Sequence, residues 1–205
     1  STHCISSAAS DVYKRQHLPE TIYVIRKGDM VIRPKYDEYQ QTNGTEIIRF
    51  DQTRKESPFK VQRIIERSCK FYGNNYISKK AETNRITGIS SKPPILLTPL
   101  FPTYFFPTHS DRQEENIWIN MHYIENVKEL KNRKSKIIFA NGDSLTLNVS
   151  FHSLWHQYTN AIIYYYMVDK QSRMKSNNPE QPIDYNQSSL NIFEALSRYS
   201  LFEEN

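Results

Sequence analysis

β-branched and aromatic residues dominate three runs near the start of the chain, at 21–26, 29–36 and 45–50. Gly28 separates the first two runs, and Asn43-Gly44 precedes the third. Because glycine and the Asn-Gly dipeptide favour tight turns, the pattern predicts two or three antiparallel strands with turns at these points.

A helical period replaces this pattern after Ser57-Pro58, which is typical of a helix start with a serine cap and proline in the first turn. Apolar residues then recur with a period of 3.6 and predict a helix over 58–72 that ends at Gly73. They are Val61, Ile64, Ile65, Cys69 and Tyr72. The opposite face carries Lys60, Arg63, Arg67 and Lys70, and only Glu66 interrupts this basic series.

The segment that follows is irregular in pattern. Residues 73–80 predict a turn with a lysine pair, and a short helix or irregular segment then continues to Arg85. Residues 90–94 cannot be helical, since each proline forces its predecessor into extended geometry. The apolar bursts at 95–97 and 104–106 predict short strands between proline-fixed loops.

Strand patterns return in the second half of the chain. Alternation over 117–130 predicts strands with a bulge near Tyr123. Residues 136–149 predict a hairpin with a type I′ turn at Asn141-Gly142. Ser150 then caps a helix over 150–173, and its wide aromatic stripe is typical of a core or a subunit interface. The stripe consists of Phe151, Leu154, Trp155, Tyr158, Ile162 and Tyr165.

These elements indicate an α+β fold with an antiparallel β-rich core and amphipathic helices. Residues 1–16 are rich in Ser and Ala, and we interpret them as a disordered leader or an appended remnant. Residues 17–173 form the main region. Residues 174–205 read as an acidic linker followed by a second C-terminal helix near 188–201.

The charge of the chain is unevenly distributed. The whole chain carries 27 Lys and Arg against 22 Asp and Glu. Residues 53–92 hold ten cations against three carboxylates, a net of +7, whereas residues 176–205 hold one cation against five carboxylates, a net of −4. Such asymmetry is typical of a protein with a polyanionic partner, although a solvated basic surface gives the same pattern.

Motifs for catalysis and cofactor binding are absent from the sequence. There is no phosphate-cradling glycine loop, C-x-x-C, H-E-x-x-H or G-x-S-x-G. His152 and His156 have a metal-ligand spacing without a third ligand, so boundary histidines are the favoured interpretation. Cys69 falls on an apolar stripe and reads as a core residue. We therefore expect that the protein is not an enzyme and that it binds no cofactor or metal. No apolar run is long enough to span a bilayer.

Several ordered sequence blocks lie between residues 22 and 173. They are RSCKFYG at 67–73, KKAET at 79–83, ISSKPPI at 89–95, FFPT at 105–108, Trp118-Ile119 and FANGDSLTLNVS at 139–150. Together these blocks resemble the ComK family of competence transcription factors. Within the family the resemblance is to a staphylococcal member. Residues 1–16 match nothing in the family, and the tail after about Met174 diverges.

The resemblance implies a cytoplasmic activator of DNA-uptake genes that binds AT-rich dyad sites, largely through the minor groove, as a homodimer or dimer of dimers. It also implies control by a MecA-type Clp protease adaptor, although the divergent tail makes an adaptor contact there doubtful. We expect phosphate contacts from Arg63, Arg67 and Lys70. The expected groove or phosphate contacts are Lys79, Lys80, Arg85 and Lys92, and base-edge contacts are expected from Asn74 and Asn75.

For oligomer formation we expect an interface made by Phe151, Trp155, Tyr158, Ile162 and Tyr165. Two alternatives to a DNA-binding protein stay open. The first is an interaction protein whose basic segment binds an acidic partner or RNA. The second, a nuclease, lacks a carboxylate cluster fit for Mg²⁺.

Overall fold

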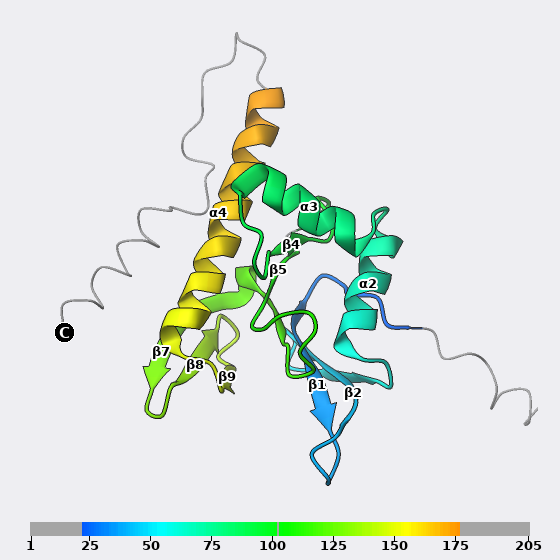
Figure 1. The fold of residues 1–205 in the computed structure, drawn as a ribbon, viewed down its shortest axis with the longest axis vertical. Coiled ribbons are helices and arrows are strands. Elements are labelled where there is room, and N and C mark those ends of the chain that lie inside the picture. The colour runs from blue at the N-terminus through cyan, green and yellow to red at the C-terminus, as the bar shows by residue number, and fades with distance from the viewer. Residues whose placement is uncertain (1–21, 102, 177–205) are drawn as a thin grey trace, which may run out of the picture.

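The structure is a computed structural model and describes residues 22–101 and 103–176. This part of the chain forms two antiparallel sheets and three α-helices (Figure 1). The larger sheet has the strand order β3-β2-β1-β6-β5-β4. Its strands are β1 (Asp29–Tyr36), β2 (Thr42–Arg49), β3 (Arg54–Ser57), β4 (Ile95–Leu96), β5 (Tyr104–Pro107) and β6 (Trp118–Asn120).

The smaller sheet has the order β7-β8-β9, with β7 (Ile124–Leu130), β8 (Lys134–Phe139) and β9 (Ser144–Leu147). The helices are α2 (Val61–Phe71), α3 (Tyr76–Thr87) and α4 (Phe151–Ser176), and a 3₁₀ turn, η1 (Met121–Tyr123), joins the two sheets. The expected α+β class with an antiparallel sheet is confirmed. The second C-terminal helix expected near 188–201 lies outside the described residues.

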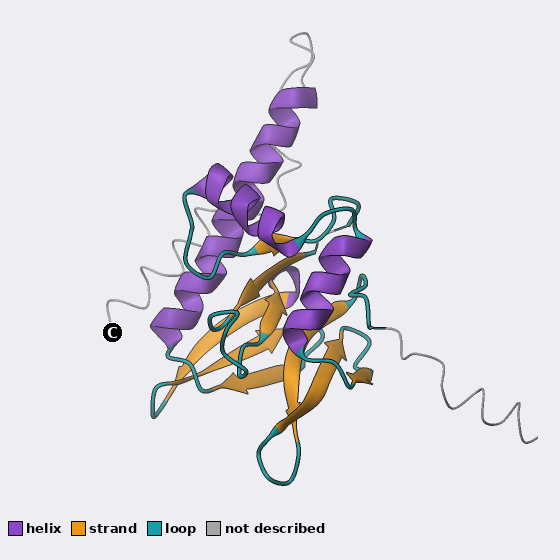
Figure 2. Cartoon of the chain, turned by 45° about the vertical axis from the view of Figure 1, so that its right-hand side comes forward, coloured by secondary structure: helices purple, strands orange, loops and turns teal. Residues whose placement is uncertain are grey.

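Consecutive residues of the central strands point to opposite faces of the larger sheet and enter two separate cores. One core lies under α2 and takes Ile32, Ile47, Phe105 and Trp118. The other takes Val31, Ile48, Phe106 and Ile119, together with α4 and the inner face of the smaller sheet. The structure is therefore layered, with α2 on one face of the larger sheet, and α4 and the smaller sheet packed into the core on the other face (Figure 2).

The strand expected at 21–26 is wrong for the described residues 22–26, which are irregular. Side chains of Ser68 in α2 and of Tyr72, the C-cap of that helix, form hydrogen bonds with the backbone there. The Ile25 N–H donates to Ser68 Oγ at 3.0 Å, and the Ile25 carbonyl accepts from Tyr72 Oη at 2.7 Å. Ile25 is fully buried, so the apolar run packs as a strap across α2 and needs no neighbouring strand.

The turn expected at Asn43-Gly44 is also wrong, because both residues lie inside β2. The chain turns at 37–41 instead, where Asp37 Oδ1 accepts from the backbone N–H groups of Tyr39 and Gln41, both at 2.9 Å. Gly44 has a φ of +148°, and a Cβ there would lie 2.4 Å from the Ser57 carbonyl oxygen. Glycine is thus required for the close approach of β3 rather than for a turn.

The helix expected over 58–72 is confirmed in its apolar face, since Val61, Ile64, Ile65 and Cys69 are buried. Its start is different. Ser57 ends β3 and Lys60 occupies the N-cap without a side-chain hydrogen bond. Residues 76–80, expected in a turn, begin α3, which Asn75 caps through a 2.8 Å bond from the Ser78 N–H and which ends at Gly88 with a φ of +77°.

The hairpin expected over 136–149 is confirmed, but its turn is not type I′. Of the two turn residues only Gly142 has a positive φ, at +87°. The Gly142 N–H donates to the Phe139 carbonyl and the Phe139 N–H donates to the Asp143 carbonyl, both at 2.9 Å. This is a three-residue loop with glycine in the left-handed position. The Ser150 cap of α4 is present, since Ser150 Oγ accepts from the Ser153 N–H at 3.3 Å.

Candidate nucleic-acid interface

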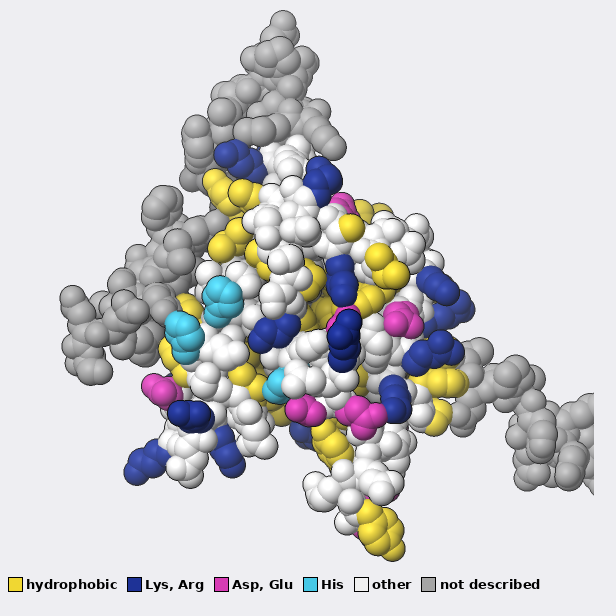
Figure 3. Space-filling model, viewed as in Figure 1, with side chains coloured by type: hydrophobic (Ala, Val, Ile, Leu, Met, Phe, Trp, Pro, Cys, Tyr) yellow, Lys and Arg dark blue, Asp and Glu magenta, His cyan; other side chains and the backbone are white. Residues whose placement is uncertain are grey.

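The outer face of α2 presents a row of uncompensated cations. Arg63, Arg67 and Lys70 are exposed, and in the described part of the chain none of them has an ion-pairing carboxylate. Lys60, at the start of the same face, is paired with Glu114. Dark blue side chains accordingly gather along the edge of the molecule that α2 forms (Figure 3). Three of the four expected helix cations are therefore free to meet a polyanion.

The lysine pair of α3 is in a different state. Lys79 is only 8% exposed. Lys80 Nζ lies 2.9 Å from Asp111 Oδ2 and 5.0 Å from the ring centroid of Tyr76. The hydrogen bond from Lys80 lowers the pKa of the Asp111 carboxyl below its ordinary value. Lys80 must give up this ion pair before it can bind a phosphate, so its net contribution to the binding of a polyanion would be small.

The remaining expected contacts flank α3. Asn75 uses Oδ1 to cap the helix, and Asn74 Oδ1 accepts from the Asn75 N–H at 2.8 Å, so both amide oxygens are occupied. Arg85 is exposed near the end of the helix. Lys92 is half-buried with a φ of +46°, and it lines a hollow of about 320 Å³ together with His152 and His156. The structure thus distributes the expected residues over α2, both ends of α3 and a loop.

The aromatic stripe of α4 packs within the chain's own core. Trp155 and Ile162 are buried, and Phe151, Tyr158 and Tyr165 lie partly buried against the same core. Phe151 stacks on Trp155 with ring centroids 5.8 Å apart. The sequence left open whether the stripe lies in the core or at a subunit interface. These contacts place it in the core. Pairing of the helix with a second copy stays a prediction.

Three side chains that the sequence analysis considered for possible chemistry, Cys69, His152 and His156, show no sign of it in the structure. Burial raises the pKa of the Cys69 thiol to about 11, which disfavours the nucleophilic thiolate at neutral pH. His152 and His156 have no third partner, since no group of three metal-ligating side chains occurs among the described residues. None of the described helices is long and apolar enough to cross a membrane.

A second group of cations lies on the hairpin formed by β7 and β8, and none of them has an ion pair among the described residues. The sequence interpretation did not consider this group. Residues 128–136 hold five cations against Glu129, a net of +4. In Figure 3 these side chains form the dark blue group at the lower left, away from α2. The run KELKNRKSK shows this concentration of positive charge in the sequence. The interpretation was based instead on residues 53–92, whose net charge is larger.

A row of exposed cations on one helix, with no ion pair among the described residues, is typical of a protein that binds a polyanion. Comparison with known proteins makes this specific. The chain belongs to the ComK family, because the family described as "ComK protein" matches residues 20–173. The resemblance found in the sequence is thereby confirmed for the family, and the staphylococcal member stays a prediction.

One curated relative is the protein named competence transcription factor from Bacillus subtilis (strain 168). It is 34% identical over 98 residues, which cover 48% of this chain and 51% of that protein. The match therefore spans about half the length of the relative. No solved structure matches the chain.

Proposed function

We propose that this chain is a DNA-binding transcription activator of competence genes that reads AT-rich dyad sites largely through the minor groove. Membership in the ComK family is the observation that carries the proposal, and the relative named competence transcription factor supports it. The exposed cation row of α2 supplies a surface of the required charge.

Minor-groove recognition requires dense positive charge and little hydrogen-bond code. The groove of an A-tract is narrow and strongly negative, and its donor and acceptor pattern separates A·T from G·C only coarsely. In this proposal Arg63, Arg67 and Lys70 bind phosphates, and Arg85 and Lys92 reach the groove or neighbouring phosphates. Lys79, Lys80, Asn74 and Asn75 make secondary contacts, because burial, an ion pair and helix capping already engage them.

The experiment is a titration of the full chain with an AT-rich and a GC-rich duplex of equal length at several salt concentrations. We expect tighter binding to the AT-rich duplex. If six to eight phosphates are neutralised per protomer, log affinity falls with log salt at a slope of about −5 to −7. Equal affinity for the two duplexes would favour the alternative, a general binder of RNA or acidic partners.

A variant tests the role of α2 in the same assay. Replacing Arg63, Arg67 and Lys70 by Gln removes three exposed charges that make no ion pair within the described residues. Each lost phosphate contact reduces the steepness of the salt dependence by about 0.9, so the slope should become less steep by about 3. An unchanged slope would remove α2 from the interface.

Assembly and control are part of the proposal. We expect a homodimer or dimer of dimers on DNA, a cytoplasmic location, and recognition by a MecA-type Clp protease adaptor. Sedimentation of the chain, free and bound to a dyad duplex, tests the first point, and a monomer in both states would contradict it. The acidic tail considered for the adaptor contact lies outside the described residues.

A further inference from the structure

The smaller sheet has one buried and one open face. Along β7, β8 and β9, alternate residues enter the core next to α4: Val127, Ile137, Phe139, Leu145 and Leu147. The residues between them form the other face, where Lys128, Leu130, Lys134, Ser144 and Thr146 are exposed and Lys136 is half-buried. We call Lys128, Lys134 and Lys136, with Lys131 and Arg133 of the adjoining turn, the basic sheet face.

Like charges stand directly opposite one another on this face. Lys128 pairs with Lys136 across β7 and β8, and Lys134 pairs with Leu130. Like charges at opposite positions of an antiparallel pair are destabilising. No residue of the basic sheet face forms an ion pair with any carboxylate in the described ranges.

The larger sheet shows the opposite arrangement and serves as an internal comparison. There Glu46 stands between two cations, with its carboxylate 2.6 Å from Arg33 Nε and 2.9 Å from Arg54 Nη1, and Lys35 is paired with Glu56. Arg33, Lys35 and Arg54 of that sheet thus have carboxylate partners on other strands, whereas Lys55 has none among the described residues. The basic sheet face lacks such partners, so its field extends into the solvent.

Protection of a sheet edge does not explain these lysines. Lysine on an edge strand prevents pairing with another chain, which suits Lys128 on β7. Lys134 and Lys136, however, lie on β8, the central strand of the sheet, whose two edges are already paired. Edge protection therefore does not account for Lys134 and Lys136.

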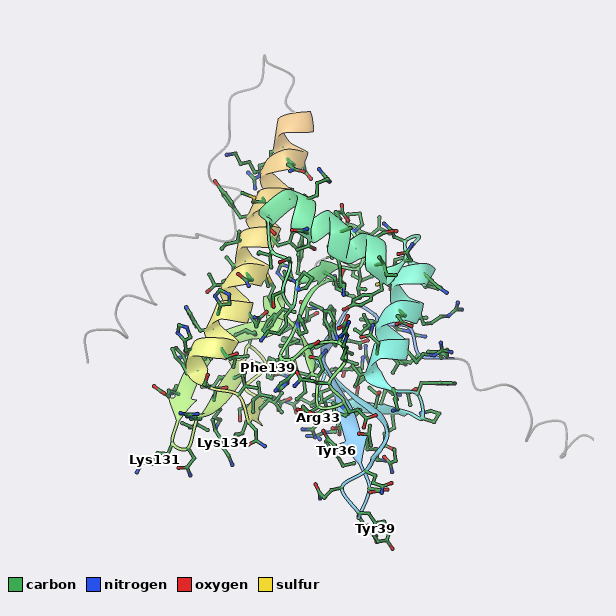
Figure 4. The ribbon with its side chains drawn as sticks, in the orientation of Figure 1. Arg33, Tyr36, Tyr39, Lys131, Lys134 and Phe139 are labelled. Atoms are coloured by element: carbon green, nitrogen blue, oxygen red, sulfur yellow. The ribbon has the colours of Figure 1, made fainter. Side chains whose placement is uncertain are left out.

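The turn at the end of the hairpin also presents cations. Asn132 and Arg133 have φ values of +62° and +55°, a left-handed conformation that is strained for residues other than glycine. Lys131 and Lys134 lie at the end of the hairpin, which projects from the body of the molecule (Figure 4). The hairpin is anchored on its inner side by Val127 and Ile137, so the projecting cations rest on a packed support.

We infer that the basic sheet face binds the sugar-phosphate backbone of duplex DNA as a second contact surface, separate from α2. This inference rests on the proposed function. The five cations bind phosphates, and exposed Ser144 and Thr146 are neutral hydroxyl donors of the kind that accompany phosphate contacts. Since phosphates carry no sequence information, this surface contributes affinity equally for every duplex sequence.

The test replaces the three exposed lysines by Gln, as Lys128→Gln, Lys131→Gln and Lys134→Gln in one chain. A matched control removes the same charge from exposed positions elsewhere, as Lys27→Gln, Lys55→Gln and Lys170→Gln. Wild type and both variants are titrated with AT-rich and GC-rich duplexes over a range of salt. Urea unfolding verifies the fold, and we expect no loss of stability in the first variant because it relieves the Lys128 and Lys136 repulsion.

We expect the sheet-face variant to lose about three units of salt slope and roughly 100- to 1,000-fold in affinity at 0.1 M salt, equally for both duplexes. The control should stay close to wild type. Two results would overturn the inference while the proposed function stands: a sheet-face variant that binds like wild type, or a control that loses as much. If wild type shows no duplex binding, the proposed function itself fails.

Discussion

Acidification should weaken the fold through protonation of His122. His122 packs against the rings of Tyr104 and Tyr165, with ring centroids 5.6 and 5.3 Å away. Its Nε2 is buried and has no hydrogen-bond partner within the described ranges. Burial lowers the pKa of the His122 imidazole to about 4, because the charged form loses its hydration there. The folded state therefore holds this side chain neutral.

The magnitude follows from the difference between the folded and unfolded pKa. The stabilisation is complete above the unfolded pKa of about 6.5, falls as the pH drops through that value, and stops falling near the folded pKa. The full loss is about 3 kcal/mol, of which about 2 kcal/mol lies between pH 7.5 and pH 5.0.

The assay compares wild type with His122→Phe, which keeps an aromatic ring in the same position and cannot be protonated. Free energies of unfolding from urea titrations at pH 7.5 and 5.0 should show that wild type loses about 2 kcal/mol more than the variant. His109, whose pKa burial also lowers, and the carboxylates act equally in both proteins and cancel. Equal losses in the two proteins would refute the reasoning.

Three further outcomes are expected from single substitutions. Gly44→Ala should destabilise the fold by about 2 to 3 kcal/mol in urea unfolding, and more than Gly88→Ala, because a Cβ at Gly88 meets no atom within 4 Å. Lys80→Ala should weaken duplex binding less than Arg67→Ala in an anisotropy titration, since Lys80 is already paired. Ser150→Ala should cost about 1 kcal/mol in the same unfolding assay through the lost cap of α4, whereas no change would exclude that role.

Local signals were sufficient for several elements. The apolar stripe of α2, the hairpin around Gly142 and the Ser150 cap depend on residues within one or two turns of each other, and each is confirmed. The boundaries of α3 were also signalled locally, by Asn75 as N-cap and by Gly88 as the left-handed end. The sequence analysis did not predict these boundaries, because α3 lacks the apolar stripe by which an amphipathic helix is recognised.

Long-range contacts account for what the sequence could not predict. A net charge summed over 53–92 counts every cation equally. In the structure, however, Lys60 and Lys80 are paired with Glu114 and Asp111, which lie 54 and 31 residues further along the chain. The backbone of Ile25 likewise forms hydrogen bonds with Ser68 of α2 and with Tyr72, the C-cap of that helix, rather than with a strand. Such partners are set by the packing of distant segments, which no local pattern encodes.

The centre of the larger sheet has a consequence for how the chain reaches this structure. β1 pairs there with β6 through Val31 opposite Ile119 and Ile32 opposite Trp118, residues almost ninety positions apart. Closing so long a loop before any pairing energy is gained makes folding slow and dependent on the chain length available. Until residue 120 is present, β1 and β5 each offer an open hydrogen-bonding edge. Fragments that end before β6 should therefore aggregate rather than fold. In a nascent chain, the exposed edge of β1 would stay unpaired until β6 has been synthesised.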